Sequence, residues 1–190
     1  MADEERRIHN CDQRSPVLEF CHEALAKSVK LEQCGATSPG FVAGTSSVAW
    51  PIATLMARYL CSRPELVRGR SVVELGAGVG IVGSAAAALQ VARRVILTDW
   101  EGALPLLERN RERLAEDSVE IHVGKLEWGC EEDQAALLKG NDGGFDLILA
   151  SDVIIAGFYT DRLAASIVAL AKRHPDTTVL IGFEFREELH

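Results

Sequence analysis

The sequence predicts an α/β fold with a doubly wound, mostly parallel sheet. Short β-branched segments alternate with helical segments from residue 71 to residue 183, and this alternation is typical of parallel strands joined by right-handed crossovers. A glycine cluster follows the first of these strands directly. The 190 residues, 47% of them hydrophobic, suit one globular domain with a sizeable core.

The first 62 residues precede this alternating pattern. Residues 1–15 are charged and lack periodicity, which predicts a flexible tail before a single domain of residues 16–190. Residues 17–20 and 28–33 alternate as hairpin strands would, although residues 23–27 could equally begin a helix. A loop over residues 34–47 leads to a helix near Pro51, since proline suits a first helical turn.

The strand over residues 71–75 runs into Gly76-Ala77-Gly78-Val79-Gly80 and then into an alanine-rich helix. This order is typical of nucleotide-binding sites, because glycine lets the backbone lie directly against a ligand. The glycines read as G-x-G-x-G from Gly76, whereas the dinucleotide spacing G-x-G-x-x-G requires Gly78, Gly80 and Gly83. We favour the first reading because Glu74 places a carboxylate near the end of a buried strand, where a cationic ligand would be its partner.

The second strand of the alternating region, residues 94–98, ends at Asp99. A carboxylate at this point can accept hydrogen bonds from both ribose hydroxyls of a nucleotide. The alternative is that Asp99 only caps the helix that starts near Glu101. A surface helix is expected over residues 104–114, with apolar positions at 104, 107 and 114.

The remaining segments predict strands at residues 119–123, 144–150 and 177–183, and a helix at 161–173. Ligands of such sheets bind beyond the carboxyl ends of the strands. We therefore expect residues 70–190 to be the ligand-binding core, with five residues sharing this edge of the sheet: Glu74, Gly76, Asp99, Ser151 and Asp152.

In these residues the chain resembles the class I, seven-stranded S-adenosylmethionine-dependent methyltransferases, whose Rossmann-like domain carries an acid-x-G-x-G-x-G motif. Two more segments resemble family 16 of that class, the non-histone protein-lysine methyltransferases. One is Trp50-Pro51 at the start of a helix. The other is Leu126-Glu127-Trp128-Gly129, which is similar to a Leu-Asp-Trp-Gly segment of the family.

The resemblance implies S-adenosyl-L-methionine as cofactor and a lysine side chain of a protein as acceptor. Trp50 would help to enclose the cofactor, and Trp128 would lie against its adenine. Asp152 is the expected catalytic residue, because a carboxylate attracts and orients a lysine amine. The expected cofactor-binding residues are Trp50, Glu74, Gly76, Ala77, Gly78, Gly80, Asp99, Trp100, Glu127, Trp128 and Ser151.

Departures from the family pattern keep other functions open. Family members commonly have Asp-x-x-Tyr at Asp152, whereas this chain has Ile155, with Tyr159 close by. Small-molecule methylation and a catalytically impaired cofactor-binding or interaction module therefore remain alternatives, and a dehydrogenase fits less well. The histidines form no H-x-x-x-H pair, so no metal is expected.

Charge and cysteine content bear on partners and location. The formal charge of −8 argues against nucleic acid as a partner and suits a basic protein better. The five cysteines are scattered and include no C-x-x-C pair, which favours reduced thiols in a cytoplasmic protein, with the nucleus as an alternative location. We see no signal peptide and no membrane span.

The class usually continues past the fifth strand with a helix and an antiparallel hairpin, and residues 184–190 are too few to supply them. We therefore expect a truncated form or a short isoform that binds cofactor but transfers methyl groups weakly or not at all. The strand over residues 177–183 would then lie at an open sheet edge, where self-association is expected.

Overall fold

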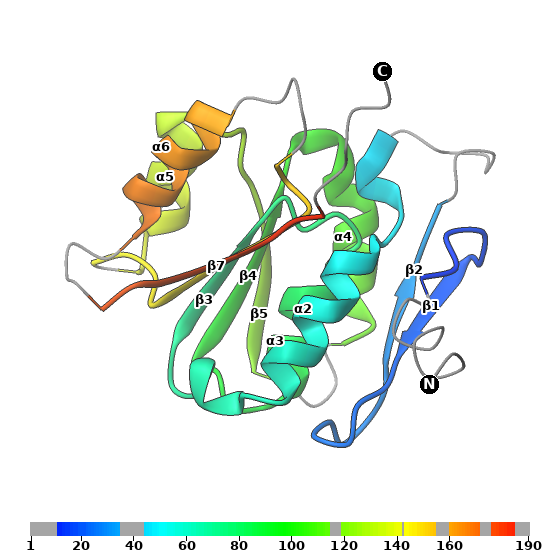
Figure 1. Ribbon diagram of the computed structural model, residues 1–190. Helices are drawn as coiled ribbons and strands as arrows, with labels where there is room; N and C mark the ends of the chain where they lie inside the picture. The colour runs from blue at the N-terminus through cyan, green and yellow to red at the C-terminus, as the bar shows by residue number, and fades with distance from the viewer. Residues whose placement is uncertain are drawn as a thin grey trace.

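A computed structural model describes residues 11–34, 44–114, 119–141, 143–154, 160–171 and 176–184. Its central sheet has the strand order β5-β4-β3-β6-β7 (Figure 1). All four neighbouring pairs are parallel, which confirms the predicted doubly wound sheet. The strands are β3 (Ser71–Leu75), β4 (Arg94–Asp99), β5 (Glu120–Lys125), β6 (Leu147–Ser151) and β7 (Thr178–Gly182).

Helices cover both faces of this sheet (Figure 1). One face carries α2 (Pro51–Cys61), α3 (Ile81–Ala88) and α4 (Leu104–Glu112), and the other carries α5 (Glu131–Leu138) and α6 (Thr160–Leu170). Successive strand side chains point to opposite faces, so β3 contributes Val72 to the first hydrophobic cluster and Val73 to the second. The three central strands, β3, β4 and β6, are largely apolar because both of their faces are buried.

The predicted N-terminal hairpin is confirmed as β1 (Val17–Phe20) paired antiparallel with β2 (Val29–Glu32). Residues 23–27 form turns and bends, so the alternative of a helix there is wrong. The hairpin packs on the outer side of α3 and α4 and buries Leu18, Phe20, Val29 and Leu31 (Figure 1). It is therefore a third layer above the helices.

Two details differ from the sequence prediction. The buried face of α4 is formed by Leu106, Leu107 and Asn110, whereas Leu104 and Leu114 are only partly buried. Residues 11–15, assigned from the sequence to a flexible tail, are attached to the domain: the Gln13 side chain donates to the Ala49 carbonyl at 2.9 Å. The rest of the predicted tail lies outside the described residues.

The last strand, β7, pairs with β6 on one side, and within the described ranges no strand pairs with its other side. The predicted open edge is confirmed to that extent. Its outward side chains Val179, Ile181 and Phe183 are 38%, 41% and 50% exposed. Self-association through this edge stays a prediction.

All five cysteines are free thiols. Among the helices that the structure describes, none combines the length and the apolar character needed to cross a membrane.

Candidate functional site

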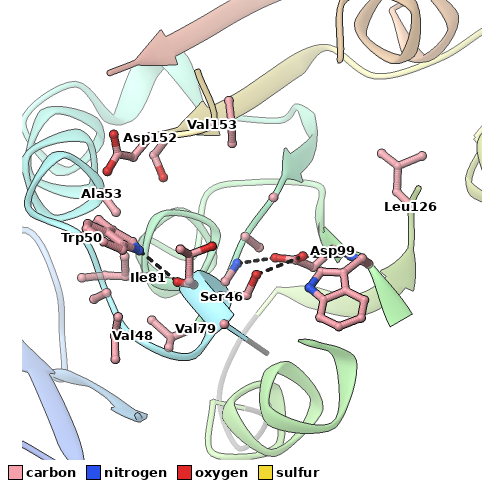
Figure 2. A pocket seen from close by; sticks show the side chains of 18 of the residues that line it. Ser46, Val48, Trp50, Ala53, Val79, Ile81, Asp99, Leu126, Asp152 and Val153 are labelled. Carbon is pink, nitrogen blue, oxygen red and sulfur yellow. Dashed lines mark hydrogen bonds between the residues drawn. The ribbon is translucent and has the colours of Figure 1, made fainter. Parts of the chain in front are cut away.

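A cavity of about 560 Å³ lies at the carboxyl ends of β3, β4 and β6 (Figure 2). Its size falls in the range of about 300–1,000 Å³ that is usual for small-molecule sites. The order of the sheet reverses between β3 and β6, and parallel sheets bind ligands at such a point. Ten of the twelve predicted site residues line the cavity: Trp50, Gly76, Ala77, Gly78, Asp99, Trp100, Glu127, Trp128, Ser151 and Asp152.

The glycine turn forms the floor of this cavity, and two of its glycines cannot carry a side chain. A Cβ on Gly76 would lie 2.8 Å from the Val153 side chain and 3.2 Å from the Trp128 ring. A Cβ on Gly78 would lie 3.3 Å from the Ser46 carbonyl oxygen. Both residues have positive φ, of 66° and 56°, which glycine adopts without strain. The turn therefore leaves room for a ligand against bare backbone.

Glu74 and Gly80, the other two predicted cofactor-binding residues, do not line the cavity. Glu74 lies one position before the end of β3 and faces α3, because side chains alternate along a strand. Its Oε2 accepts a hydrogen bond from the Gly83 N–H at 2.8 Å. The expectation that Glu74 meets a cationic ligand directly is therefore wrong, since its carboxyl group is buried between the helix and the sheet.

Gly80 serves packing at the start of α3. A Cβ there would lie 2.7 Å from the Leu107 side chain, so the residue allows α3 and α4 to approach each other. Gly83, from the dinucleotide reading, has a similar role, since its Cβ would meet Glu74 Oε2 at 2.8 Å. Only the first two glycines of the favoured motif reach the cavity.

Asp99 ends β4 and is 6% exposed. Its Oδ2 accepts from the Gly78 N–H at 2.7 Å, and its Oδ1 accepts from the Trp100 N–H at 2.8 Å and the Ser46 hydroxyl at 3.4 Å. Burial raises the pKa of Asp99 to about 6, although these hydrogen bonds act in the opposite direction and lower it. Asp99 thus braces the glycine turn and also presents a carboxylate to the cavity.

Replacing Asp99 with alanine is expected to weaken binding of S-adenosylhomocysteine by roughly 1–3 kcal/mol, the cost of removing a hydrogen bond to a charged group. Titration calorimetry measures this change. Asp146→Ala is the matched control, because Asp146 accepts from the Ser71 N–H at 2.8 Å at the opposite end of β3. Both variants should lose stability, and only Asp99→Ala should lose affinity. Equal affinities would show that Asp99 is only a brace.

Three indole rings line the cavity. Trp50 precedes α2, and its ring N–H donates to the Thr45 carbonyl at 2.9 Å (Figure 2). Trp100 is 40% exposed, and its ring covers Gly102. Trp128 is half-buried beside Gly76, in a loop fixed by the Gly129 N–H donating to Ser166 Oγ at 2.8 Å. The three indoles therefore give the cavity flat aromatic surface, and the Trp128 ring lies directly beside the glycine turn.

Asp152 follows β6 and is 9% exposed. Its φ of 55° is unusual outside glycine, and aspartate is among the few residues that adopt it readily. Its N–H donates to the Gly182 carbonyl at 2.7 Å, which continues the pairing of β6 with β7. The backbone is thus held in a conformation that places Asp152 at the cavity wall with Ser151 and Val153.

Sequence reasoning missed part of the wall. Thr45, Ser46 and Ala49 were assigned only to a loop or to the start of a helix, and Arg162 of α6 was not singled out, yet all four line the cavity. Such residues carry no motif, and only the fold brings them to the site. Ile155 and Tyr159 lie outside the described residues.

This fold and this cavity define a class I methyltransferase domain of the Rossmann-like type, with five strands in the described part of a sheet that has seven in the full class. The model of the lysine methyltransferase family matches residues 38–190. The chain therefore belongs to the lysine methyltransferase family, whose members depend on S-adenosylmethionine.

Several known proteins are similar. Protein N-lysine methyltransferase METTL21A of Danio rerio is 32% identical over 147 residues, which cover 76% of this chain and 63% of that protein. The calmodulin-lysine N-methyltransferase of Arabidopsis thaliana is 31% identical over 126 residues, covering 65% and 40%. A ribosomal protein L11 methylase structure from Lactobacillus delbrueckii subsp. bulgaricus is 27% identical with a TM-score of 0.44, covering 69% and 57%. The chain thus spans less than two thirds of the length of these relatives.

Proposed function

We propose that the protein transfers a methyl group from S-adenosylmethionine to a lysine side chain of a protein. The observation that carries the proposal is the placement of Asp152, a carboxylate that is 9% exposed, in the same cavity as the glycine turn and Asp99. The proposed cofactor-binding floor and the candidate catalytic carboxylate therefore line one cavity. Two of the similar proteins, METTL21A of Danio rerio and the calmodulin-lysine N-methyltransferase of Arabidopsis thaliana, are protein-lysine methyltransferases, which supports the same reaction.

The residues at the floor fit this cofactor. Gly76 and Gly78 leave backbone exposed where a Cβ would collide with neighbouring groups. Asp99 would accept hydrogen bonds from ribose hydroxyls, and Trp128 would offer its ring to the adenine. When bound, S-adenosylmethionine supplies an electrophilic methyl group on a sulfonium.

The acceptor end of the cavity would be formed around Asp152. A lysine must approach as a neutral amine for its nitrogen to attack, and a nearby carboxylate can attract the ammonium form and accept its proton. The backbone of Asp152 is fixed by its hydrogen bond to Gly182, so the carboxylate would hold the amine in one orientation. The indole of Trp50, which lines the same cavity, would exclude water.

Partners and location follow from the same reasoning. A chain of formal charge −8 suits a basic protein segment as substrate. Free thiols fit a cytoplasmic location, with the nucleus as an alternative.

Two measurements test the proposed function. Titration calorimetry should show binding of S-adenosylmethionine and no response to NADH, and the opposite pattern would overturn the assignment. Incubation with a labelled methyl donor and a whole-cell lysate, followed by mass spectrometry, should then place the label on a lysine. Label on a small molecule would favour small-molecule methylation, and cofactor binding without any label would indicate an impaired cofactor-binding module.

A further inference from the structure

One short segment supplies six of the residues that line the cavity: Gly44, Thr45, Ser46, Val48, Ala49 and Trp50. We call residues 44–50 the entry wall. It lies against the glycine turn, because a Cβ on Gly78 would approach the Ser46 carbonyl to 3.3 Å, and the Ser46 hydroxyl reaches Asp99 at 3.4 Å (Figure 2). The position of the entry wall therefore sets the space above the cavity floor.

Hydrogen bonds inside the entry wall fix its shape. The Trp50 ring N–H donates to the Thr45 carbonyl at 2.9 Å, and the Ser47 hydroxyl donates to the Gly44 carbonyl at 2.9 Å. Both bonds stay within the segment, so they cannot hold it in place relative to the sheet. That attachment has to come from another part of the chain.

The N-terminal segments provide the attachment at Ala49. Gln33 Oε1 accepts from the Ala49 N–H at 2.9 Å, and Gln13 Nε2 donates to the Ala49 carbonyl at 2.9 Å. Two glutamine side chains thus engage both backbone groups of one wall residue. A third bond, from the Cys34 N–H to the Ser47 carbonyl at 2.9 Å, lies beside them.

Gln33 is the central member of this arrangement. It follows β2 directly and is 3% exposed. Its Nε2 donates to the carbonyls of Asp12 and Ser15 at 3.1 and 3.0 Å, and its own N–H donates to the Pro16 carbonyl at 2.8 Å. Every polar atom of the buried amide is therefore bonded, so removing it leaves several buried groups unsatisfied.

The preceding residue, Glu32, connects the same hairpin to the cavity floor. Asn110 of α4 is fully buried, and its Oδ1 accepts from the Glu32 N–H at 2.7 Å. Its Nδ2 donates to the Glu32 carbonyl and to the Val79 carbonyl, each at 3.0 Å. Two successive residues at the end of β2 therefore reach the two sides of the cavity, Ala49 on the entry wall and Val79 in the glycine turn.

From these contacts we infer that Gln33 is a positioning residue of the cofactor site, which holds the entry wall at the distance from the glycine turn that the cofactor needs. The inference rests on the proposed function. The hairpin is then part of the site, although none of its residues lines the cavity. Since coupling between sites is reciprocal, cofactor binding must in turn stabilise the contact between hairpin and wall.

The test compares Gln33→Met with Leu18→Val in the full chain. Methionine keeps the volume of glutamine and removes the amide. Leu18→Val instead removes one buried methylene group from the core of the same hairpin and leaves each hydrogen bond to the entry wall in place. We expect Gln33→Met to raise the Kd for S-adenosylhomocysteine by about tenfold or more in calorimetry, the effect of losing one well-placed interaction. Leu18→Val should lower the melting temperature and change the Kd by less than about twofold.

Hydrogen exchange of the unaltered protein provides a second measurement that does not depend on a variant folding. The Ala49 N–H donates to Gln33, so its exchange reports the contact directly. S-adenosylhomocysteine should slow exchange in residues 44–50 and in residues 29–34. Unchanged exchange in residues 29–34, or equal Kd values for the two variants, would overturn the role of Gln33. Absence of binding to the unaltered protein would instead overturn the proposed function.

Discussion

Replacing Asp152 with asparagine is expected to lower methyl transfer by about 100-fold or more, the usual contribution of a positioned acid or base, while the affinity for S-adenosylhomocysteine changes little. The amide keeps the shape of the side chain but can neither attract an ammonium group nor accept its proton. Asparagine also tolerates the φ of 55° at this position, so the backbone should not change. Turnover is measured with the acceptor that the labelled-donor experiment identifies.

Asp161→Asn is the matched control for Asp152→Asn. Asp161 lies in the first turn of α6, is exposed and does not line the cavity, so the same substitution removes one negative charge outside the site. Its turnover should stay within about threefold of the unaltered protein, because exposed charges interact weakly. If both variants lose activity equally, general charge explains the effect, and if neither does, Asp152 has no catalytic role.

The buried carboxyl group of Glu74 is expected to make the protein less stable as the pH rises. Burial is the main cause that raises its pKa from 4.5 to about 8, and the nearby Asp99 charge adds to it, whereas the Gly83 hydrogen bond opposes it. The folded protein therefore binds a proton that the unfolded chain has released above pH 4.5. This contribution to stability is complete below pH 4.5 and is lost as the pH rises to about 8. Its size is on the order of 5 kcal/mol.

Urea unfolding at several pH values tests this expectation with Glu74→Gln. The amide cannot ionise, so the variant should be more stable than the unaltered protein at pH 8 and should lose the decline above pH 6. The variant should still lose stability as the pH rises from 3.8 to about 6, because the pKa of Asp99 is also raised, from 3.8 to about 6. Glu131→Gln, which removes an exposed carboxylate that lies outside the cavity, should keep the original profile. A pH-independent stability of the unaltered protein would contradict a neutral Glu74.

Most of the fold could be predicted from local patterns. The β-branched run at residues 71–75, the glycine cluster and the alanine-rich helix are each set by residues close in sequence. The hairpin and the parallel pairing of the strands agree with the structure for the same reason. Gly76, Asp99, Ser151 and Asp152 could be placed at the cavity because strand ends in a parallel sheet meet at one edge. Trp50, Glu127 and Trp128, which also line it, came from the resemblance to the family.

The two misplaced residues show where local patterns fail. Glu74 lies close to the end of its strand, but alternation along β3 turns it toward α3, and this face is decided by packing. Gly80 belongs to the same motif as Gly76, yet its missing side chain admits Leu107 from a later helix. In both cases the partner is distant in sequence.

The sequence by itself therefore determined the class of fold, the parallel pairing of its strands and the residues that carry a motif. Only the tertiary structure decided which side chains face the cavity, that Gln33 holds Ala49, and that Asn110 connects the hairpin to Val79. These hydrogen bonds join positions 16 and 31 residues apart. The physical reason is that a buried polar group must find a partner wherever the fold supplies one, and no pattern of neighbouring residues specifies that partner.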